Sequence, residues 1–191
     1  MLSGIIKAES GDVLIDGRPV TNLPIHIRAR KGLGLLPQET SVFRGLSVLD
    51  NLKTASELHR TEATKQDEDE RIENLLIQFG LKEIEERQGK FLSGGEKRRL
   101  ELARLLVSSP KYVLLDEPFA GVDPISINEI KRHISSLAQD NIGVLITDHN
   151  AVDMLDICDN VFVMSDGAII FEGKPEAVAA NETVKSVYLG N

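Results

Sequence analysis

Two hydrophobic periodicities alternate along the 191 residues of this chain. Short apolar runs of strand length recur, and each is ended by turn-forming residues. They lie at 12–15, 33–36, 112–115, 142–147, 161–164 and 168–171. The second, third and fourth runs are continuously apolar, which is typical of parallel strands covered on both faces. Asp166 and Gly167 separate the last two runs and predict a hairpin turn.

Helical periodicity occupies the intervals between these runs. Ser47 is placed to cap a helix that runs to Leu58, and apolar residues recur at helical spacing in three later segments. These segments are 68–79, 96–107 and 127–137. The stretch 61–71 is polar and acid-rich, and we interpret it as a solvated loop and the start of a helix. The order of the elements predicts an α/β fold, a parallel-sheet core interrupted by a helical insert at about 45–105.

Composition and charge exclude several classes of function. The formal net charge is −8, which argues against a nucleic-acid-binding protein and against docking on anionic lipid. No apolar run approaches the roughly 18 residues of a membrane span, and the first residues do not resemble a signal peptide. The single cysteine, Cys158, cannot form an intramolecular disulfide. We therefore expect a soluble, cytoplasmic protein with no nucleic-acid partner and no membrane insertion.

Polar side chains gather where the predicted parallel strands end. Gln38 follows the first of these strands, Asp116 and Glu117 follow the second, and Asp148 and His149 follow the third. Open parallel sheets bind ligands beyond the carboxyl ends of their strands. Any one of these residues alone would be an ordinary capping or surface group, but the ordered set predicts a functional site.

The two adjacent carboxylates can divide two tasks, because successive side chains of a strand point in opposite directions. We expect Asp116 to orient Mg²⁺, through water, since Mg²⁺ prefers few protein ligands. We expect Glu117 to polarise or deprotonate an attacking water. The alternative is that these acids only form a turn or a helix start after the strand.

Two further segments carry candidate chemistry. Ser93-Gly94-Gly95-Glu96 opens a predicted helix, and its glycines allow an anion to approach free backbone N–H groups at the helix N-terminus. The alternative for this segment is an ordinary serine cap after a glycine turn. Asp123 precedes Pro124, and its alternative is a turn residue before a proline-started helix.

These motifs resemble those of ATP-binding cassette (ABC) ATPases, and the resemblance extends over essentially the whole chain. It implies a P-loop NTPase (RecA-like) core formed by 1–44 and 106–191, and a helical subdomain formed by 45–105. The implied roles follow the motifs of the family. Gln38 is the Q-loop residue, and it binds Mg²⁺ together with Asp116. Asp116 and Glu117 are the Walker B pair, and Ser93 to Glu96 are the signature, which contacts the ATP of a second subunit. Asp123 is in the D-loop, and His149 is the switch histidine.

Within this family, four segments are most similar to the ATPases of lipopolysaccharide export in Gram-negative bacteria. They are 36–38, 118–125, 147–150 and 187–190. The ATPases of branched-chain amino acid importers are the near alternative. A non-catalytic subunit that only occupies the membrane partner is another. A chromosome-maintenance ATPase is disfavoured, because the insert before the signature is short and the charge is unsuitable for DNA.

The resemblance also implies the ligands and partners. It implies ATP and Mg²⁺, a dimer with a second ATPase subunit, and transmembrane permease subunits that hold the protein at the cytoplasmic face of the inner membrane. Phe43 and Arg44 follow the Q-loop and are the expected permease contact, since interface anchors favour aromatic residues and arginine. The alternative for Phe43 is packing within its own subdomain.

One family motif has no counterpart in these residues. The phosphate-loop pattern G-x-x-x-x-G-K-[ST] does not occur among the 191 residues, and in the family it lies before the region that corresponds to Met1. We therefore expect the chain by itself to hydrolyse ATP hardly at all. We also expect an open cleft and unpaired edges beside the strands at 33–36 and 112–115.

Overall fold

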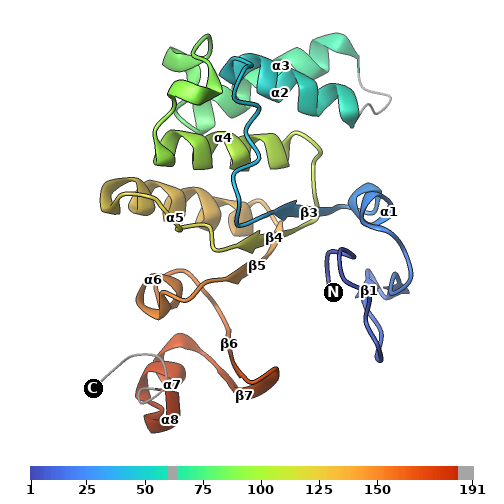
Figure 1. The fold of residues 1–191 in the computed structure, drawn as a ribbon, viewed down its shortest axis with the longest axis vertical. Helices are drawn as coiled ribbons and strands as arrows, with labels where there is room; N and C mark the ends of the chain where they lie inside the picture. Colours follow the sequence, from blue (N-terminus) through green and yellow to red (C-terminus); the bar gives the residue numbers. More distant parts are fainter. Residues whose placement is uncertain (60–63, 185–191) are drawn as a thin grey trace. The chain divides into compact units, whose positions relative to one another are not determined.

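A computed structural model describes residues 1–59 and 64–184 (Figure 1). The chain divides into two compact units, Met1–Thr147 and Asp148–Asn191, which are described separately. The predicted helical subdomain lies wholly within the first unit, so its boundaries stay a prediction. The segment 187–190, which contributes to the family resemblance, lies outside the described residues. In the part of the chain that is described, no helix has the length and apolar character needed to cross a membrane.

The first unit is built on a parallel sheet of three strands. They are β3 (Leu33–Leu36), β4 (Tyr112–Asp116) and β5 (Gly143–Thr147). Their order is β3-β4-β5, and the register pairs Leu33 with Tyr112 and Tyr112 with Gly143. The three continuously apolar runs therefore form a parallel sheet as predicted.

The expected unpaired edge at Tyr112–Leu115 is wrong, because β4 lies between two neighbours. Among the described residues, β3 and β5 each pair on one side only, so the free edges belong to them. The side chains of β5 alternate between exposed and partly buried, although its sequence is continuously apolar. The sequence of β5 predicts burial on both faces, but the structure covers this strand only partly.

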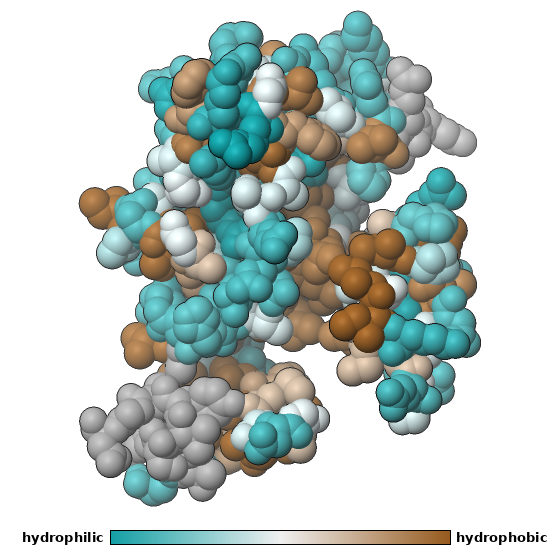
Figure 2. All heavy atoms as spheres, in the orientation of Figure 1, coloured by the Kyte–Doolittle hydropathy of each residue, from teal (hydrophilic) through white to brown (hydrophobic). Residues whose placement is uncertain are grey.

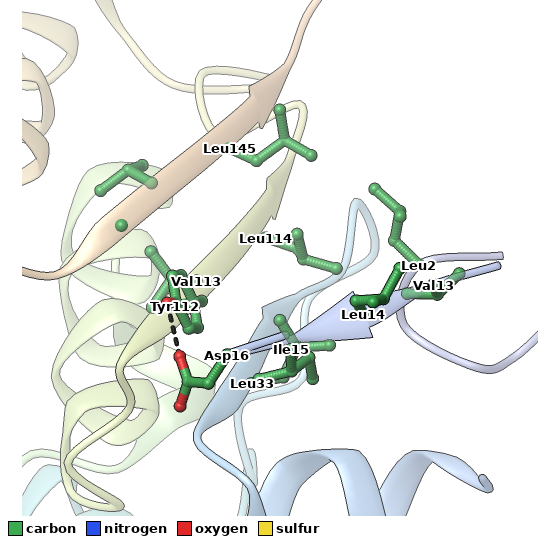
Figure 3. A pocket seen from close by; sticks show the side chains of 12 residues that line it. Leu2, Val13, Leu14, Ile15, Asp16, Leu33, Tyr112, Val113, Leu114 and Leu145 are labelled. Atoms are coloured by element: carbon green, nitrogen blue, oxygen red, sulfur yellow. Dashed lines mark hydrogen bonds between the residues drawn. The ribbon is translucent and has the colours of Figure 1, made fainter. Parts of the chain in front are cut away.

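An open cleft of about 370 Å³ lies beside the sheet, as predicted (Figure 3). Apolar side chains from all three strands line it, and so do Leu2 and the hairpin strand β1 (Leu14–Ile15). At its rim the Tyr112 hydroxyl donates to Asp16 Oδ1 at 2.7 Å. Figure 2 shows hydrophobic atoms gathered where the N-terminal segment lies beside the sheet.

Four long helices of the first unit match the predicted ones. They are α2 (Val48–Leu58), α3 (Lys65–Gln78), α4 (Gly94–Leu106) and α5 (Pro124–Gln139). The last three begin two or three residues before their predicted starts, because the capping side chain stands before the first periodic apolar residue. Thr64, Ser93 and Asp123 each accept a hydrogen bond from the backbone N–H three residues further on.

Shorter elements that the periodicity does not predict complete this unit. They are β2 (Arg18–Pro19), α1 (Ile25–Arg30), and the 3₁₀ turns η1 (Lys82–Ile84) and η2 (Gly89–Phe91). Helix α4 lies at the centre, between α2 and the sheet, and it also contacts α3 and α5 (Figure 1). Leu100 and Leu102 of α4 are fully buried. The signature segment therefore opens the best-covered helix of the unit.

The second unit contains an antiparallel hairpin and short helices. Its elements are α6 (Ala151–Leu155), β6 (Val161–Ser165), β7 (Ala168–Gly173), α7 (Pro175–Ala180) and α8 (Glu182–Val184). The predicted hairpin is confirmed, and its turn residues Asp166 and Gly167 both have positive φ. Val163, Val178 and Val184 form a small core.

Candidate functional site

Two residues that the sequence places at neighbouring strand ends meet in the structure. Gln38 follows β3 and Glu117 follows β4, and these strands pair in parallel. The Gln38 side-chain amide Nε2 donates a hydrogen bond to Glu117 Oε2 at 2.7 Å, across 79 positions of sequence. The two side chains therefore lie together at the carboxyl edge of the sheet.

The two adjacent acids contact different parts of the sheet. Asp116 pairs with Thr147 of β5, and the Thr147 hydroxyl donates to Asp116 Oδ1 at 2.6 Å. The backbone N–H of Glu117 donates to the Thr147 carbonyl at 2.8 Å, and Glu117 has a φ of 44°. This left-handed conformation is uncommon outside glycine and directs the Glu117 side chain differently from that of Asp116. Asp116 is held by β5, whereas Glu117 is held by Gln38.

The segment Ser93–Glu96 forms a reciprocal cap at the N-terminus of α4. Ser93 Oγ accepts from the Glu96 backbone N–H at 3.2 Å, and Glu96 Oε2 accepts from the Ser93 backbone N–H at 2.8 Å. Arg87 also donates to Glu96, at 2.9 Å. Burial acts to raise the pKa of Glu96, but the hydrogen bonds from Ser93 and the charge of Arg87 lower it overall. The ordinary capping role is thus present, and it leaves the anion-binding role as a prediction.

The two signature glycines lie against the D-loop segment of the same chain. A Cβ at Gly94 would be 2.8 Å from the Gly121 carbonyl oxygen, and one at Gly95 would collide with the Ser126 side chain. Asp123 caps α5 by accepting from the Ser126 backbone N–H at 3.0 Å, and hydrogen bonds from the Ser126 side chain and backbone lower the pKa of Asp123. The turn-and-cap role of Asp123 is therefore present. The sequence predicts that the two glycines bind an anion. It does not predict that they pack against the D-loop segment, because no spacing in the sequence indicates this contact.

The sheet edge offers oxygen donors of the kind that magnesium takes. The described residues contain no cluster of three or more His, Cys, Asp or Glu side chains that could enclose a metal. Mg²⁺ is held in phosphate-binding sites by one or two carboxylates, with water and phosphate oxygens as its other ligands. Asp116 is exposed and the Gln38 amide oxygen lies on the same edge, so an incomplete oxygen set of this kind is present.

His149 belongs to the second unit and is described there. Its side chain is 77% exposed, and its Nδ1 lies 3.7 Å from Asp148 Oδ1. The same oxygen accepts the Asn150 backbone N–H at 2.9 Å, and Asn150 caps α6. The expectation that His149 joins the residues at the sheet edge stays a prediction.

Phe43 and Arg44 lie on the surface of the helical segment. Asn51 holds the Phe43 backbone by accepting from its N–H and donating to its carbonyl. The guanidinium of Arg104 lies over the Phe43 ring, 4.5 Å from its centroid, while the residue remains 41% exposed. The Arg44 carbonyl accepts the Lys90 backbone N–H. Phe43 thus packs partly on its own chain and stays partly exposed, and its role as a permease contact stays a prediction.

Sequence reasoning misses two charged residues that lie behind the site. Arg98 and Glu101 of α4 are buried, and Arg98 donates to the backbone carbonyls of Glu117 and Pro118. The signal that could have found them is their spacing, because two charged residues three positions apart share a face with the buried positions of this helix.

Comparison with known proteins decides the family. A family model described as "ABC transporter" matches residues 1–120. The chain belongs to the ABC transporter family. Two relatives in this family, from Haemophilus influenzae and Escherichia coli K12, are both named "Lipopolysaccharide export system ATP-binding protein LptB". Each is 46% identical over 190 residues, which is 100% of this chain and 78% of the relative.

Solved structures of ABC transporter cassettes confirm the predicted fold class. The ADP conformation of MJ1267, described as an ATP-binding cassette of an ABC transporter, matches with a TM-score of 0.85 at 27% identity. The match covers 100% of this chain and 81% of MJ1267. The family model and the 46% identity confirm the predicted resemblance to ABC ATPases and to those of lipopolysaccharide export.

Proposed function

We propose that this chain is the ATP-binding and ATP-hydrolysing subunit of an ABC transporter that exports lipopolysaccharide to the outer membrane. The observation that carries the substrate is the 46% identity, across the whole chain, to relatives named for that export system. The pairing of Gln38 with Glu117 supports the chemistry, because it brings two motif residues of the family together at the sheet edge.

In this proposal Glu117 is the general base. Its carboxylate is only partly buried and accepts a hydrogen bond from Gln38, which an ionised carboxylate can do while keeping a lone pair for a water proton. A positioned carboxylate base contributes about 10²–10⁴-fold to such a reaction. His149 would contact the terminal phosphate, and Asp123 would belong to the dimer-facing loop.

Asp116 and Gln38 would hold Mg²⁺ together with phosphate oxygens of ATP. The bound ion would neutralise charge on those oxygens. Ser93, Gly94, Gly95 and Glu96 would present the N-terminus of α4 to the ATP of a second ATPase subunit, since free backbone N–H groups and the helix dipole favour a phosphate there.

The remaining partners would be the transmembrane permease subunits, which Phe43 and Arg44 would contact. Phe43 is partly exposed and its backbone is held by Asn51, so a partner side chain would meet a preorganised anchor. The chain would then lie peripherally on the cytoplasmic face of the inner membrane.

The proposal is tested by a hybrid protein in Escherichia coli. These 191 residues replace the matching 78% of the E. coli LptB chain, so that the rest of LptB supplies the segment where the family resemblance places the phosphate loop. The hybrid is expressed while the resident LptB is depleted, and newly made lipopolysaccharide is measured at the cell surface. We expect export to be restored by the hybrid but not by the same hybrid carrying Glu117→Gln.

Two failures have different meanings. If the hybrid hydrolyses ATP but does not restore export, the chain is an ABC ATPase that serves another substrate, such as an amino acid. If it assembles with the permease and hydrolyses no ATP, the non-catalytic alternative holds.

A further inference from the structure

One face of α4 carries three charged residues at helical spacing. Arg98, Glu101 and Arg104, hereafter the α4 stripe, lie three positions apart and so stand one above the other. Arg98 and Glu101 are each only 4% exposed. Charged side chains are almost never buried to this degree unless they are paired, so their contacts indicate what the burial serves.

Arg98 holds the backbone behind the proposed base. Its Nη2 donates to the Glu117 carbonyl at 2.7 Å and its Nε to the Pro118 carbonyl at 2.9 Å. Its Nη1 donates to the Pro37 carbonyl at 3.3 Å. One guanidinium therefore joins the loops that follow β3 and β4, and it does so at Glu117, whose left-handed backbone needs support from its surroundings.

Glu101 holds the segment that follows Gln38. Its Oε1 accepts the Thr40 hydroxyl at 2.8 Å and the Ser41 backbone N–H at 2.5 Å. Its Oε2 accepts Arg98 Nη1 at 3.2 Å. The ion pair of α4 is thus satisfied on both sides by the two loops that carry Gln38 and Glu117.

Arg104 extends these contacts to the surface. Its Nη1 donates to the Ser41 carbonyl, and its guanidinium covers the Phe43 ring. The segment from Pro37 to Phe43 is consequently fixed to α4 at successive points along its length. The N-terminus of that same helix is the Ser93 turn.

We propose that Arg98 and Glu101 are positioning residues, which set where the Gln38–Glu117 pair lies relative to the signature turn. This inference rests on the proposed function for its catalytic meaning. The competing role is structural, in which the ion pair merely fills the space between α4 and the loops. A buried ion pair can often be replaced by apolar residues without loss of stability, so stability and positioning can be separated.

The test is amide hydrogen exchange of the 191-residue chain, read for residues 38–43 and 117–120. Glu101→Gln keeps the shape of the side chain but turns one acceptor into a donor that faces Arg98. We expect exchange in both loops to become about tenfold faster, while the amides of α2 change no more than the global stability does. The matched control is Glu129→Gln, which removes the ion pair between α5 and Arg99 of the same helix. It should leave both loops unchanged.

A double variant decides between the two roles. Arg98→Met with Glu101→Leu replaces the pair by apolar side chains and should keep the melting temperature close to that of the wild type. If the loops of this variant exchange faster despite the retained melting temperature, the positioning role holds. If they stay as protected as in the wild type, or if every amide of the chain accelerates equally in Glu101→Gln, the proposal is overturned.

These outcomes do not depend on ATP turnover. In the hybrid used to test the proposed function, the same Glu101→Gln change should lower kcat with KM little changed. An unmodified hybrid that hydrolyses no ATP would count against the proposed function alone, because the exchange experiment would still report on the loops.

Discussion

Helix α4 and strand β5 both carry leucines that their patterns predict to be buried, yet the structure buries them to different extents. Leu100 of α4 is fully buried, whereas Leu145 of β5 is 40% exposed. Helix α4 packs against α2, α3, α5 and β3, but β5 pairs with a strand on one side only among the described residues. The apolar pattern therefore predicts which side chains of an element can be buried, and the neighbouring elements determine whether those side chains are buried.

The largest expected effect is on folding stability, and it differs between the two elements. Leu100→Ala should lower the free energy of unfolding by about 2–5 kcal/mol, because it leaves a cavity in a closed core. Leu145→Ala removes the same atoms from a half-open surface and should cost less than about 1 kcal/mol. Urea denaturation of both variants measures the difference. Equal losses would show that β5 is as well covered as α4.

The open side of the sheet should also promote self-association. Unpaired strand edges and apolar clefts recruit other chains. Leu145→Lys places a charge in the cleft beside β5 and should weaken self-association by about tenfold in sedimentation equilibrium, the change expected for about 1.4 kcal/mol. Ile125→Lys is the control, since Ile125 is exposed on α5 and does not line the cleft. Equal weakening by both changes would contradict the role of the cleft.

A smaller effect is expected at the start of α4. Ser93→Ala removes the side-chain acceptor of the reciprocal cap and should lower stability by about 1 kcal/mol. Ser93→Asp keeps an acceptor and should recover most of that loss. Both are read from thermal melts at neutral pH, and a Ser93→Ala melt identical to the wild type would show that the cap adds nothing to α4.

The smallest expected effect is a pH dependence of the free energy of unfolding that arises from His133 of α5. The His133 ring stacks on Phe79 with centroids 4.5 Å apart, and burial, together with the charge of Arg99, lowers the pKa of His133 below its ordinary value of 6.5. The unfolded chain then binds the proton first, so stability is full above pH 6.5 and falls as the pH drops through that value toward the folded-state pKa. Urea denaturation at pH 7.5 and 5.5 measures this loss. His133→Phe keeps the stack without titrating and should lose less over the same interval; an equal loss would assign it to other groups.

The sequence predicts the longer elements best. The parallel strands, the four long helices and the β6–β7 hairpin all lie where the periodicity places them, because each has enough residues to show a period. Helix α1 has six residues and no such pattern, so it could not be found. Free edges are predicted at 33–36 and 112–115, and only the first is found, because a sequence does not show which strands become neighbours.

The residues of the candidate site likewise divide into those that the sequence predicts and those that it does not. The pairing of Gln38 with Glu117 follows from two strand ends, and the sequence indicates it. The spacing of Arg98 and Glu101 places them on the buried face of α4, but their partners could not be predicted, because these are backbone groups that only the folded loops present. The placement of His149 depends on the second unit, and its role stays a prediction.

The central claim is that Glu117 is the base of an ABC-type ATPase. The most direct test is the rate of Mg²⁺-dependent ATP hydrolysis by the purified hybrid, with and without Glu117→Gln, together with ATP binding by equilibrium dialysis. We predict that turnover falls by about 10²–10⁴-fold while ATP binding is retained, because the amide keeps the shape but cannot accept the proton. Turnover by Glu117→Gln close to that of the unmodified hybrid would contradict it.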